Sequence, residues 1–379
     1  MYTPNYERRG ILPILGGTAV LRNNDISTFS LEVNGGDLLS SRFEKGWRIV
    51  IEDEGQQLCA GVPSTLGRSS NDGAHTLDLS GSDDMVWLRD MITLPNPAAA
   101  ADNQDQDAYW KASGQGAPLI YNLTRLLVGQ NARTEFRRPL MVNNPGAGFG
   151  KTLSVNTRFK TVLEEVQSLA IQSGAVVTLS QDDTNRRTVM DIAAGRDLSR
   201  AVRMTEINGG IGGWELSEEA PTVTQVLVAG QGEGTERTLK LVSGNANEWG
   251  FRGLQFQDRR DTNDIAELTL AGEETLEEGR AQANITVEIH ETPNKRFGRD
   301  FHLGDTITVQ LADGALVTDI VQTAEISWGE NGREVKLTIG PVANEQDAPR
   351  WVPLVKSLQA QIRALQRSEE HTSELQSHA

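Results

Sequence analysis

The sequence is poor in cysteine and in positive charge. Only one of its 379 residues is cysteine, Cys59, so no disulfide can form within the chain. Lys and Arg number 36 against 52 Asp and Glu, which gives a formal net charge of −16. A negative surface disfavours nucleic acids and anionic membranes as partners, because both are polyanions, although solubility alone also explains such a charge.

Long hydrophobic runs are also missing from the sequence. No apolar stretch follows a basic start at the N-terminus, and no apolar run is long enough to span a bilayer. We therefore expect a protein made in the cytoplasm without a signal peptide and without membrane insertion. If it acts outside a cell, something else must carry it there.

The last residues do not fit the rest of the chain. Residues 367–379 spell RSEEHTSELQSHA, which resembles the in-frame translation of a sequencing-adapter oligonucleotide. We treat this segment as a probable non-native artefact, exclude it from the fold prediction, and expect the true C-terminus to be missing. The chain stays acidic without the one Arg and three Glu of this segment.

What the sequence has instead is glycine, 37 residues in all, between short apolar segments. Alternation of apolar and polar residues predicts strands at 18–22, 27–33, 47–51 and 76–81, and helical spacing follows at 84–91. Strands this frequent are typical of a small barrel or sandwich. We predict a first β-barrel-like domain at residues 1–95.

The middle of the chain has a different pattern. We predict a loop at residues 96–117, a helix from Pro118 and a stronger helix from Phe159 that Gly174 ends as its C-cap. Strands at 175–180 and 188–193 follow, joined by a polar turn at 181–186. These elements predict an α/β insertion domain over residues 96–215.

Strand patterns return in the last part of the chain. They lie at 223–229, 238–242, 284–291, 305–311, 316–321, 325–328 and 333–339, with one helix predicted at 273–283. We predict a second β-barrel-like domain at 216–345, then a helix at 346–366 that could begin a coiled coil. The expected fold class is therefore mainly β with a smaller α/β insertion.

Three glycine-rich or acidic segments imitate ligand-binding motifs. Residues 146–152 resemble a phosphate-binding loop, but Pro145 stands where its first glycine belongs and an extended segment follows instead of a helix. Residues 230–234 lack the third glycine of a dinucleotide fingerprint and lie between two strands, which favours a hairpin turn. Residues 102–107 lack the Gly and Glu of a calcium loop, so we interpret them as a solvated loop.

Candidate catalytic groups do not form a constellation. Asp83 and Asp84 are better explained as the N-cap and first-turn acid of the helix that follows, and Cys59 as a buried thiol. His75, His290 and His302 have no metal-ligand spacing, and no Gly-x-Ser-x-Gly nucleophile motif occurs. We predict no catalytic, cofactor-binding or metal-binding residues, no cofactor, and a protein that is not an enzyme.

The seven tryptophans are scattered, at Trp47, Trp87, Trp110, Trp214, Trp249, Trp328 and Trp351. Such rings can stack on sugars, but core or interface packing is their more frequent use. A carbohydrate-binding module for host adhesion therefore stays open as an alternative function.

Five segments, in order along the chain, carry a resemblance to a known family. They are AVLRNN with FSLEV (19–33), GWRIVI with CAGV (46–62), TLDLSGSDD with Leu88, Arg89 and Pro95 (76–95), GQGEGTER (230–237) and FGRDFHLGDTITV (297–309). Together they resemble minor tail and baseplate-hub proteins of long-tailed, siphovirus-type phages and prophages of actinobacteria. The likeness covers most of residues 15–342.

The resemblance implies a structural subunit near the distal tail tip that helps to assemble the tail and attach it to the host. Related hubs are β-barrel proteins, usually trimers around the tail axis, and they offer no catalytic residues to carry over. We therefore expect a virion protein with other copies of itself and other tail proteins as partners, and a cell-surface glycan as a further candidate. A cell-wall hydrolase, with its domain in the missing C-terminal part, and a subunit of a phage-derived injection machine are further alternatives.

Overall fold

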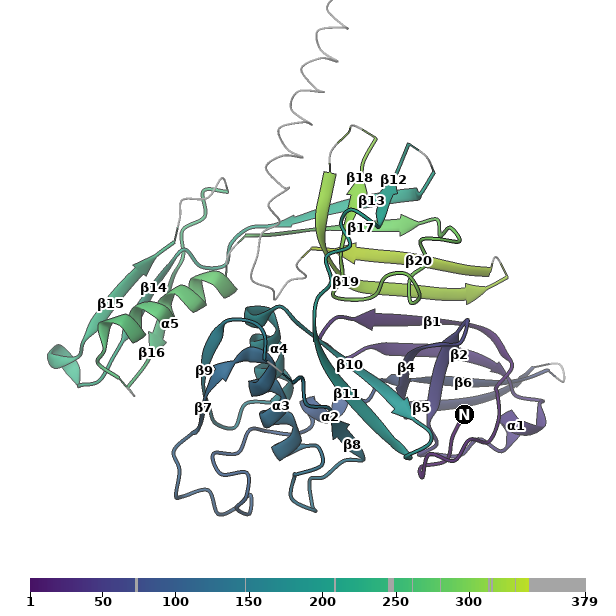
Figure 1. Cartoon of the computed structure of the whole chain (residues 1–379), viewed down its shortest axis with the longest axis horizontal. Coiled ribbons are helices and arrows are strands. Elements are labelled where there is room, and N and C mark those ends of the chain that lie inside the picture. Colours follow the sequence, from purple (N-terminus) through teal and green to yellow (C-terminus); the bar gives the residue numbers. More distant parts are fainter. Residues whose placement is uncertain are drawn as a thin grey trace, which may run out of the picture. The chain divides into compact units, whose positions relative to one another are not determined.

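The structure is a computed structural model that describes residues 1–71, 74–146, 148–207, 209–244, 249–260, 262–279, 281–312, 314, 316–330 and 332–340 (Figure 1). Strands account for 45% of it and helices for 14%, so the expected mainly-β class is confirmed. No helix within these ranges combines the length and the apolar character that crossing a bilayer requires. The helix predicted at 346–366 and the adapter-like segment at 367–379 lie outside the described residues.

The chain forms two compact units. Among the described residues, unit 1 contains Met1–Val202, Glu288–Ile307 and Val321–Leu337, and unit 2 contains Arg203–Val287, Thr308–Ile320 and residues 338–340. This division differs from the predicted domain boundaries at 95, 215 and 345, which stay a prediction.

An antiparallel sheet forms much of unit 1. Its strands run in the order β19 (Leu316–Gly329), β1 (Ile14–Arg22), β2 (Thr28–Asn34), β6 (Ala74–Ser82) and β5 (Pro63–Asn71), and β20 (Gly332–Ile339) follows on the far side of β19. In β2 the side chains of Phe29, Leu31 and Val33 are buried and the alternate ones are exposed. The strands predicted at 18–22, 27–33 and 76–81 are confirmed, because a half-buried sheet needs this alternation.

A hairpin and two short helices accompany the sheet. Strands β3 (Ile49–Asp53) and β4 (Gln56–Gly61) meet at Glu54 and Gly55, which both have positive φ, 46° and 77°. Two left-handed residues are what the two-residue type I′ hairpin turn requires. Helix α1 (Leu38–Ser41) is short, and the helix predicted at 84–91 shrinks to α2 (Val86–Arg89).

The helical part of unit 1 packs two helices over small sheets. Helix α3 (Gly116–Leu127) contacts α4 (Val162–Ser173), and the strands are β8 (Leu140–Val142), β10 (Ala175–Asp182) and β11 (Arg187–Ala194), with β7 (Trp110–Gln115) paired to β9 (Thr152–Thr157). Leu123, Val166 and Met190 lie in their shared core. The two helices and the hairpin at 181–186 are confirmed. The loop predicted at 96–117 was wrong in its last part, which forms β7.

Helix α4 has a complete set of end signals. Thr161 accepts a hydrogen bond from the Glu164 backbone N–H at 3.2 Å, and the Glu164 carboxylate accepts one from the Thr161 N–H at 3.0 Å. At the other end Gly174 has φ 68°, the left-handed conformation expected of its predicted C-cap.

Unit 2 contains β12 (Arg203–Thr205), β13 (Ile211–Glu219) and most of β17 (Gln282–Ile289) and β18 (Thr306–Gln310). Strands β12 and β18 pair in parallel, and β13 is the neighbour of β17. The strands predicted at 284–291 and 305–311 are thus confirmed. The two strands predicted at 316–321 and 325–328 are one continuous strand, β19.

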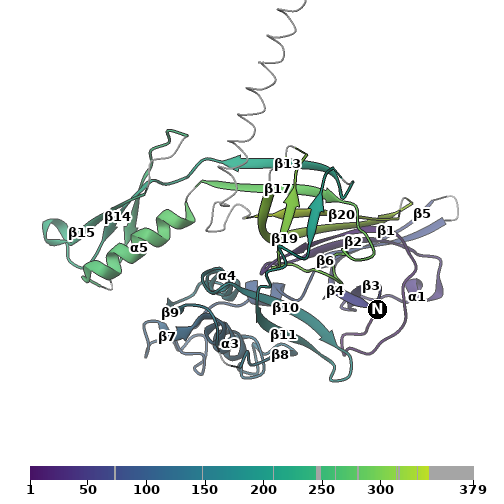
Figure 2. The same ribbon diagram turned by 45° about the horizontal axis from the view of Figure 1, so that its top comes forward.

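The rest of unit 2 is a three-stranded sheet with one helix. The strand order is β15 (Leu239–Ser243), β14 (Gln225–Ala229), β16 (Leu254–Asp258), and α5 (Ile265–Glu278) covers one face (Figures 1 and 2). The predicted helix at 273–283 was misplaced, because Asp264 caps the helix start by accepting from the Ala266 N–H at 2.7 Å. The glycine-rich segment at 230–234 joins β14 to β15 as predicted, with the 3₁₀ turn η1 (Gly234–Glu236) at its end.

Candidate functional site

The loop between β17 and β18 contains the start of the FGRDFHLGDTITV segment, and it folds back on itself. The rings of Phe297 and Phe301 pack edge to face with centroids 5.6 Å apart, and both side chains are buried. Between them the Gly298 N–H donates to the Phe301 carbonyl at 2.9 Å, and Gly298 has φ 87°. A side chain at Gly298 would be strained, so this glycine sets the turn.

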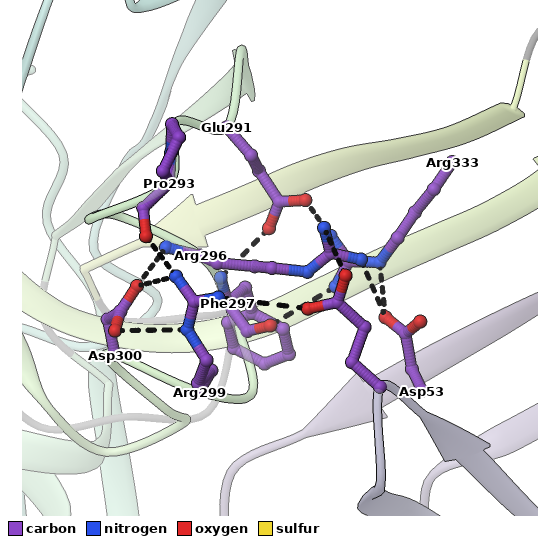
Figure 3. Close-up of polar contacts among 9 residues, drawn as sticks. Asp53, Glu291, Pro293, Arg296, Phe297, Arg299, Asp300 and Arg333 are labelled. Atoms are coloured by element: carbon purple, nitrogen blue, oxygen red, sulfur yellow. Dashed lines mark hydrogen bonds and ion pairs between the residues drawn. The ribbon is translucent and has the colours of Figure 1, made fainter.

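A cluster of charged side chains fastens this loop to the β3–β4 hairpin (Figure 3). Arg333 of β20 lies at its centre and forms ion pairs with Glu291 and with Asp53, the latter at 2.6 Å from Nε to Oδ2. Arg296 of the loop reaches the same hairpin, 3.6 Å from Asp53 and 3.1 Å from Glu54. We call these five residues, together with Arg299 and Asp300, the Arg333 cluster.

Hydrogen bonds to the backbone hold the loop in register with the cluster. Glu291 accepts from the Phe297 N–H at 2.8 Å, while Arg333 Nη2 donates to the Phe297 carbonyl at 3.1 Å. Asp300 accepts from the Arg296 N–H at 2.8 Å and pairs with Arg299 at 2.9 Å. Both polar groups of the Phe297 backbone are therefore bound by charged side chains, which fixes the turn that carries the two phenylalanines.

The electrostatics of the Arg333 cluster favour a structural role. Burial lowers the pKa of Arg333 from its ordinary value, and the opposite charges of Asp53 and Glu54 act against this shift. Its side chain is 10% exposed, and those of Asp53 and Glu291 are 17% and 14% exposed. Each carboxylate is occupied by an arginine, so none is left free to act as a base or as a metal ligand.

A second polar centre lies deeper in unit 1. The two terminal nitrogens of Arg48 donate to the two carboxylate oxygens of Asp84 at 3.0 and 2.5 Å. Thr188 donates to Asp84 at 2.6 Å, Arg48 Nε donates to Gln181 at 3.1 Å, and the guanidinium lies 4.4 Å from the ring centroid of Tyr6. All the polar atoms of this buried pair thus have partners.

The same geometry corrects the interpretation of Asp83 and Asp84 as helix-capping residues. The N-cap position of α2 is Met85, and no side chain caps it. Asp84 is instead committed to Arg48, and Asp83 accepts from the Met85 N–H at 3.2 Å, just before the helix, and also hydrogen-bonds with Ser27. A helix cap can be predicted from residues that are adjacent in the sequence. The ion pair of Asp84 with Arg48, 36 positions away, could not be predicted in this way.

Asp83 and Cys59 line one cavity of unit 1, about 360 Å³ in volume, together with Asp84, Thr188, Phe297 and His302. Burial, with a smaller contribution from the neighbouring Asp84 charge, raises the pKa of Asp83 to about 7, against hydrogen bonds with Ser27 and Met85 that lower it. Burial also raises the pKa of the Cys59 thiol well above its ordinary value. The prediction of a buried, free thiol is confirmed, and a thiol that stays protonated is a poor nucleophile.

The other residues considered from the sequence are not brought together. His75 and His290 are exposed, while His302 lies beside Arg196 and Asp305. Strand β9 follows the segment at 146–152 that resembles a phosphate-binding loop, so the helix that such a loop requires directly after it is replaced by a strand. No group of three or more His, Cys, Asp or Glu suited to a metal ion occurs among the described residues.

The tryptophans divide by exposure. Trp214 and Trp249 are 37% and 47% exposed, the four at 47, 87, 110 and 328 are half-buried, and Trp351 lies outside the described residues.

Sequence reasoning missed both polar centres, because their partners lie far apart in the chain. The only signal pointing to the Arg333 cluster was the resemblance of the 297–309 segment to the phage family.

Two solved structures share this fold over most of their length. The 43 kDa tail protein of prophage MuSo2 from Shewanella oneidensis has TM-score 0.55 and 14% identity, covering 86% of this chain and 94% of that one. The tail protein from Neisseria meningitidis MC58 has TM-score 0.56 and 13% identity, covering 87% and 92%. At sequence identities this low, the structural similarity shows a common fold and nothing further.

The curated proteins offer no match to the sequence. A protein-family model does match: residues 1–341 fit the family described as Siphovirus ReqiPepy6 Gp37-like protein. This confirms the resemblance to a siphovirus family, while the actinobacterial host group stays a prediction. The carbohydrate-binding alternative gains no support from these comparisons. With a match that spans the chain from its first residue to residue 341, the protein belongs to the Siphovirus ReqiPepy6 Gp37-like family.

Proposed function

We propose that this chain is a structural subunit of a phage tail, placed near the distal tip as a hub or minor tail protein. The observation that carries the proposal is the siphovirus family match over residues 1–341, combined with a fold shared with a prophage tail protein and with a second tail protein. In this role the chain assembles with other tail components and resides in the virion tail.

The polar chemistry of unit 1 agrees with a scaffold that has no catalytic part. In the Arg333 cluster and in the Arg48–Asp84 pair, acids and arginines neutralise each other, and side chains of the Arg333 cluster also bind backbone groups. Pre-organised pairs of this kind hold loops in place for assembly. They leave no free base beside a nucleophile.

The finer assignments belong to the same proposal. We expect several copies around the tail axis, a trimer being the arrangement that the resemblance implies, and contact with the host surface at the tail tip. Catalytic activity is not expected of this chain.

Mass spectrometry of purified virions tests the proposal. The chain should be present in intact particles, and antibodies against it should label the tail tip in electron micrographs. A peptidoglycan zymogram of the purified protein should stay blank. Absence of the chain from virions, or clearing of the gel, would contradict the proposal.

A further inference from the structure

The three-stranded sheet of unit 2 has one face that α5 does not cover. Val226, Val228 and Val242 point to α5 and form a core with Leu268 and Ala271. The register places Gln225, Ser243 and Asp258 at the strand ends on the other face, whose large apolar side chains are Leu227, Leu239, Leu241, Leu254 and Phe256. We call these five residues the open face.

The open face is apolar and exposed. Leu254, Phe256, Leu239 and Leu241 are 62%, 57%, 56% and 51% exposed. The strand register places Leu241 opposite Leu227 and Leu227 opposite Phe256, so the side chains form one continuous row across the sheet. The central strand β14 has apolar residues on both sides, which is typical of a sheet covered on both faces, and contiguous exposed apolar patches mark interaction sites.

The distribution of charge indicates what covers this face. The charged groups at its edge are Asp258, Arg237 and Arg260, and Asp258 pairs with both arginines. Helix α5, on the opposite side of the sheet, carries five glutamates in its sequence IAELTLAGEETLEE. Two copies of a chain with net charge −16 repel each other over most of their surface, but less where they present the open face, because the exposed Glu267 and Glu273 belong to α5 on the opposite side of the sheet. A cationic partner would be drawn to the α5 side instead.

The size of the open face sets the strength of the contact. Five side chains on three strands offer roughly a few hundred Å², below the about 800 Å² that each partner contributes to a standard stable interface. The contact is therefore weak by itself. It becomes stable where each copy makes further contacts, as in a closed ring of subunits.

We propose that the open face is a contact surface for a second copy of this chain. The inference rests on the proposed tail function and names the surface through which neighbouring copies meet.

Sedimentation velocity of the full chain over a range of concentrations tests the inference. Wild-type protein should self-associate as concentration rises, and Leu241→Asp or Leu254→Asp should weaken this association about tenfold or more, because a charge is placed in an apolar contact. Leu270→Asp is the matched control. Leu270 is 57% exposed on α5, outside the core under that helix, so its variant should associate like wild type. Circular dichroism establishes that all variants are folded.

Two results overturn the inference and leave the tail function standing. One is a wild-type chain that stays monomeric at every concentration while virions contain it. The other is a Leu241→Asp variant that self-associates like wild type but is lost from virions, which would mean that a different tail protein covers the face. Absence of the wild-type chain from virions would instead contradict the tail function itself.

Discussion

Arg48 and Asp84 form a two-pronged ion pair whose side chains are each only 3% exposed. The pair connects the residue before β3 with the segment between β6 and α2, and Thr188 and Gln181 extend it to the β10–β11 hairpin. Its atoms are satisfied within the protein. This geometry means that either partner alone would leave a buried charge without compensation.

Removal of one partner should therefore be costly. We expect Asp84→Ala to lower the free energy of unfolding by about 3–5 kcal/mol, because Arg48 would keep its charge without a carboxylate. Urea denaturation of the full chain, followed by circular dichroism, measures this change.

The exposed pair of Arg89 and Asp90 provides the control. Their side chains are 54% and 44% exposed, so Asp90→Ala should cost less than about 1 kcal/mol. The double variant Arg48→Met with Asp84→Leu should recover part of the loss, because apolar groups need no partner. Equal effects of Asp84→Ala and Asp90→Ala would contradict the structural role assigned to the buried pair.

Local signals explain what the sequence predicted well. The regularly spaced apolar residues of α4 are followed directly by its C-cap Gly174. In the β10–β11 hairpin, a short polar turn joins two strands that are rich in apolar residues. The short strands β7, β12 and β16 were missed, because three to six residues give little periodicity. The helix predicted to end at residue 283 ends at Glu278 in the structure. Gly279 is its C-cap, and strand β17 begins at Gln282.

The polar centres could not be predicted from the sequence in the same way. Arg48 and Asp84 are 36 positions apart, and Arg333 and Glu291 are 42 apart. Nothing in the neighbourhood of an arginine identifies which distant carboxylate it will face, because the fold decides that. The resemblance did single out residues 297–309, but gave no physical reason for them.

The Arg333 cluster predicts local loosening. Arg333→Ala removes ion pairs to Asp53 and Glu291 and a hydrogen bond to the Phe297 carbonyl, so residues 290–304 should open more often. We expect hydrogen exchange there to accelerate about tenfold or more, corresponding to a loss of about 1–3 kcal/mol in local stability. Mass-spectrometric hydrogen exchange measures the rates peptide by peptide.

Arg9→Ala is the comparison for that experiment. Arg9 pairs with Glu7 on an exposed surface, with side chains 50% and 41% exposed, so its loss should leave the 290–304 loop unchanged. If Arg333→Ala also leaves the loop exchange unchanged, the cluster does not anchor the loop.

The capping box of α4 predicts a smaller and separable effect. Thr161→Ala removes the side-chain acceptor for the Glu164 N–H, which should lower the unfolding free energy by about 0.5–2 kcal/mol. Thr161→Ser keeps the hydroxyl and should restore most of it. Thermal unfolding of the two variants side by side distinguishes a lost cap from a lost methyl group, since both would be equally destabilised in the latter case.

Asp83 should make stability depend on pH. Burial raises its pKa from 3.8 to about 7, so between these values the folded chain keeps a proton that the unfolded chain gives up. The folded state is therefore favoured at low pH, and this contribution is lost as pH rises through 7. The shift corresponds to up to about 4 kcal/mol. Because an amide cannot ionise, Asp83→Asn should be more stable relative to wild type at pH 8 than at pH 5. Urea titrations of both proteins at the two pH values give the comparison, and an Asp83→Asn effect that is the same at both would mean that this carboxyl does not titrate in that range.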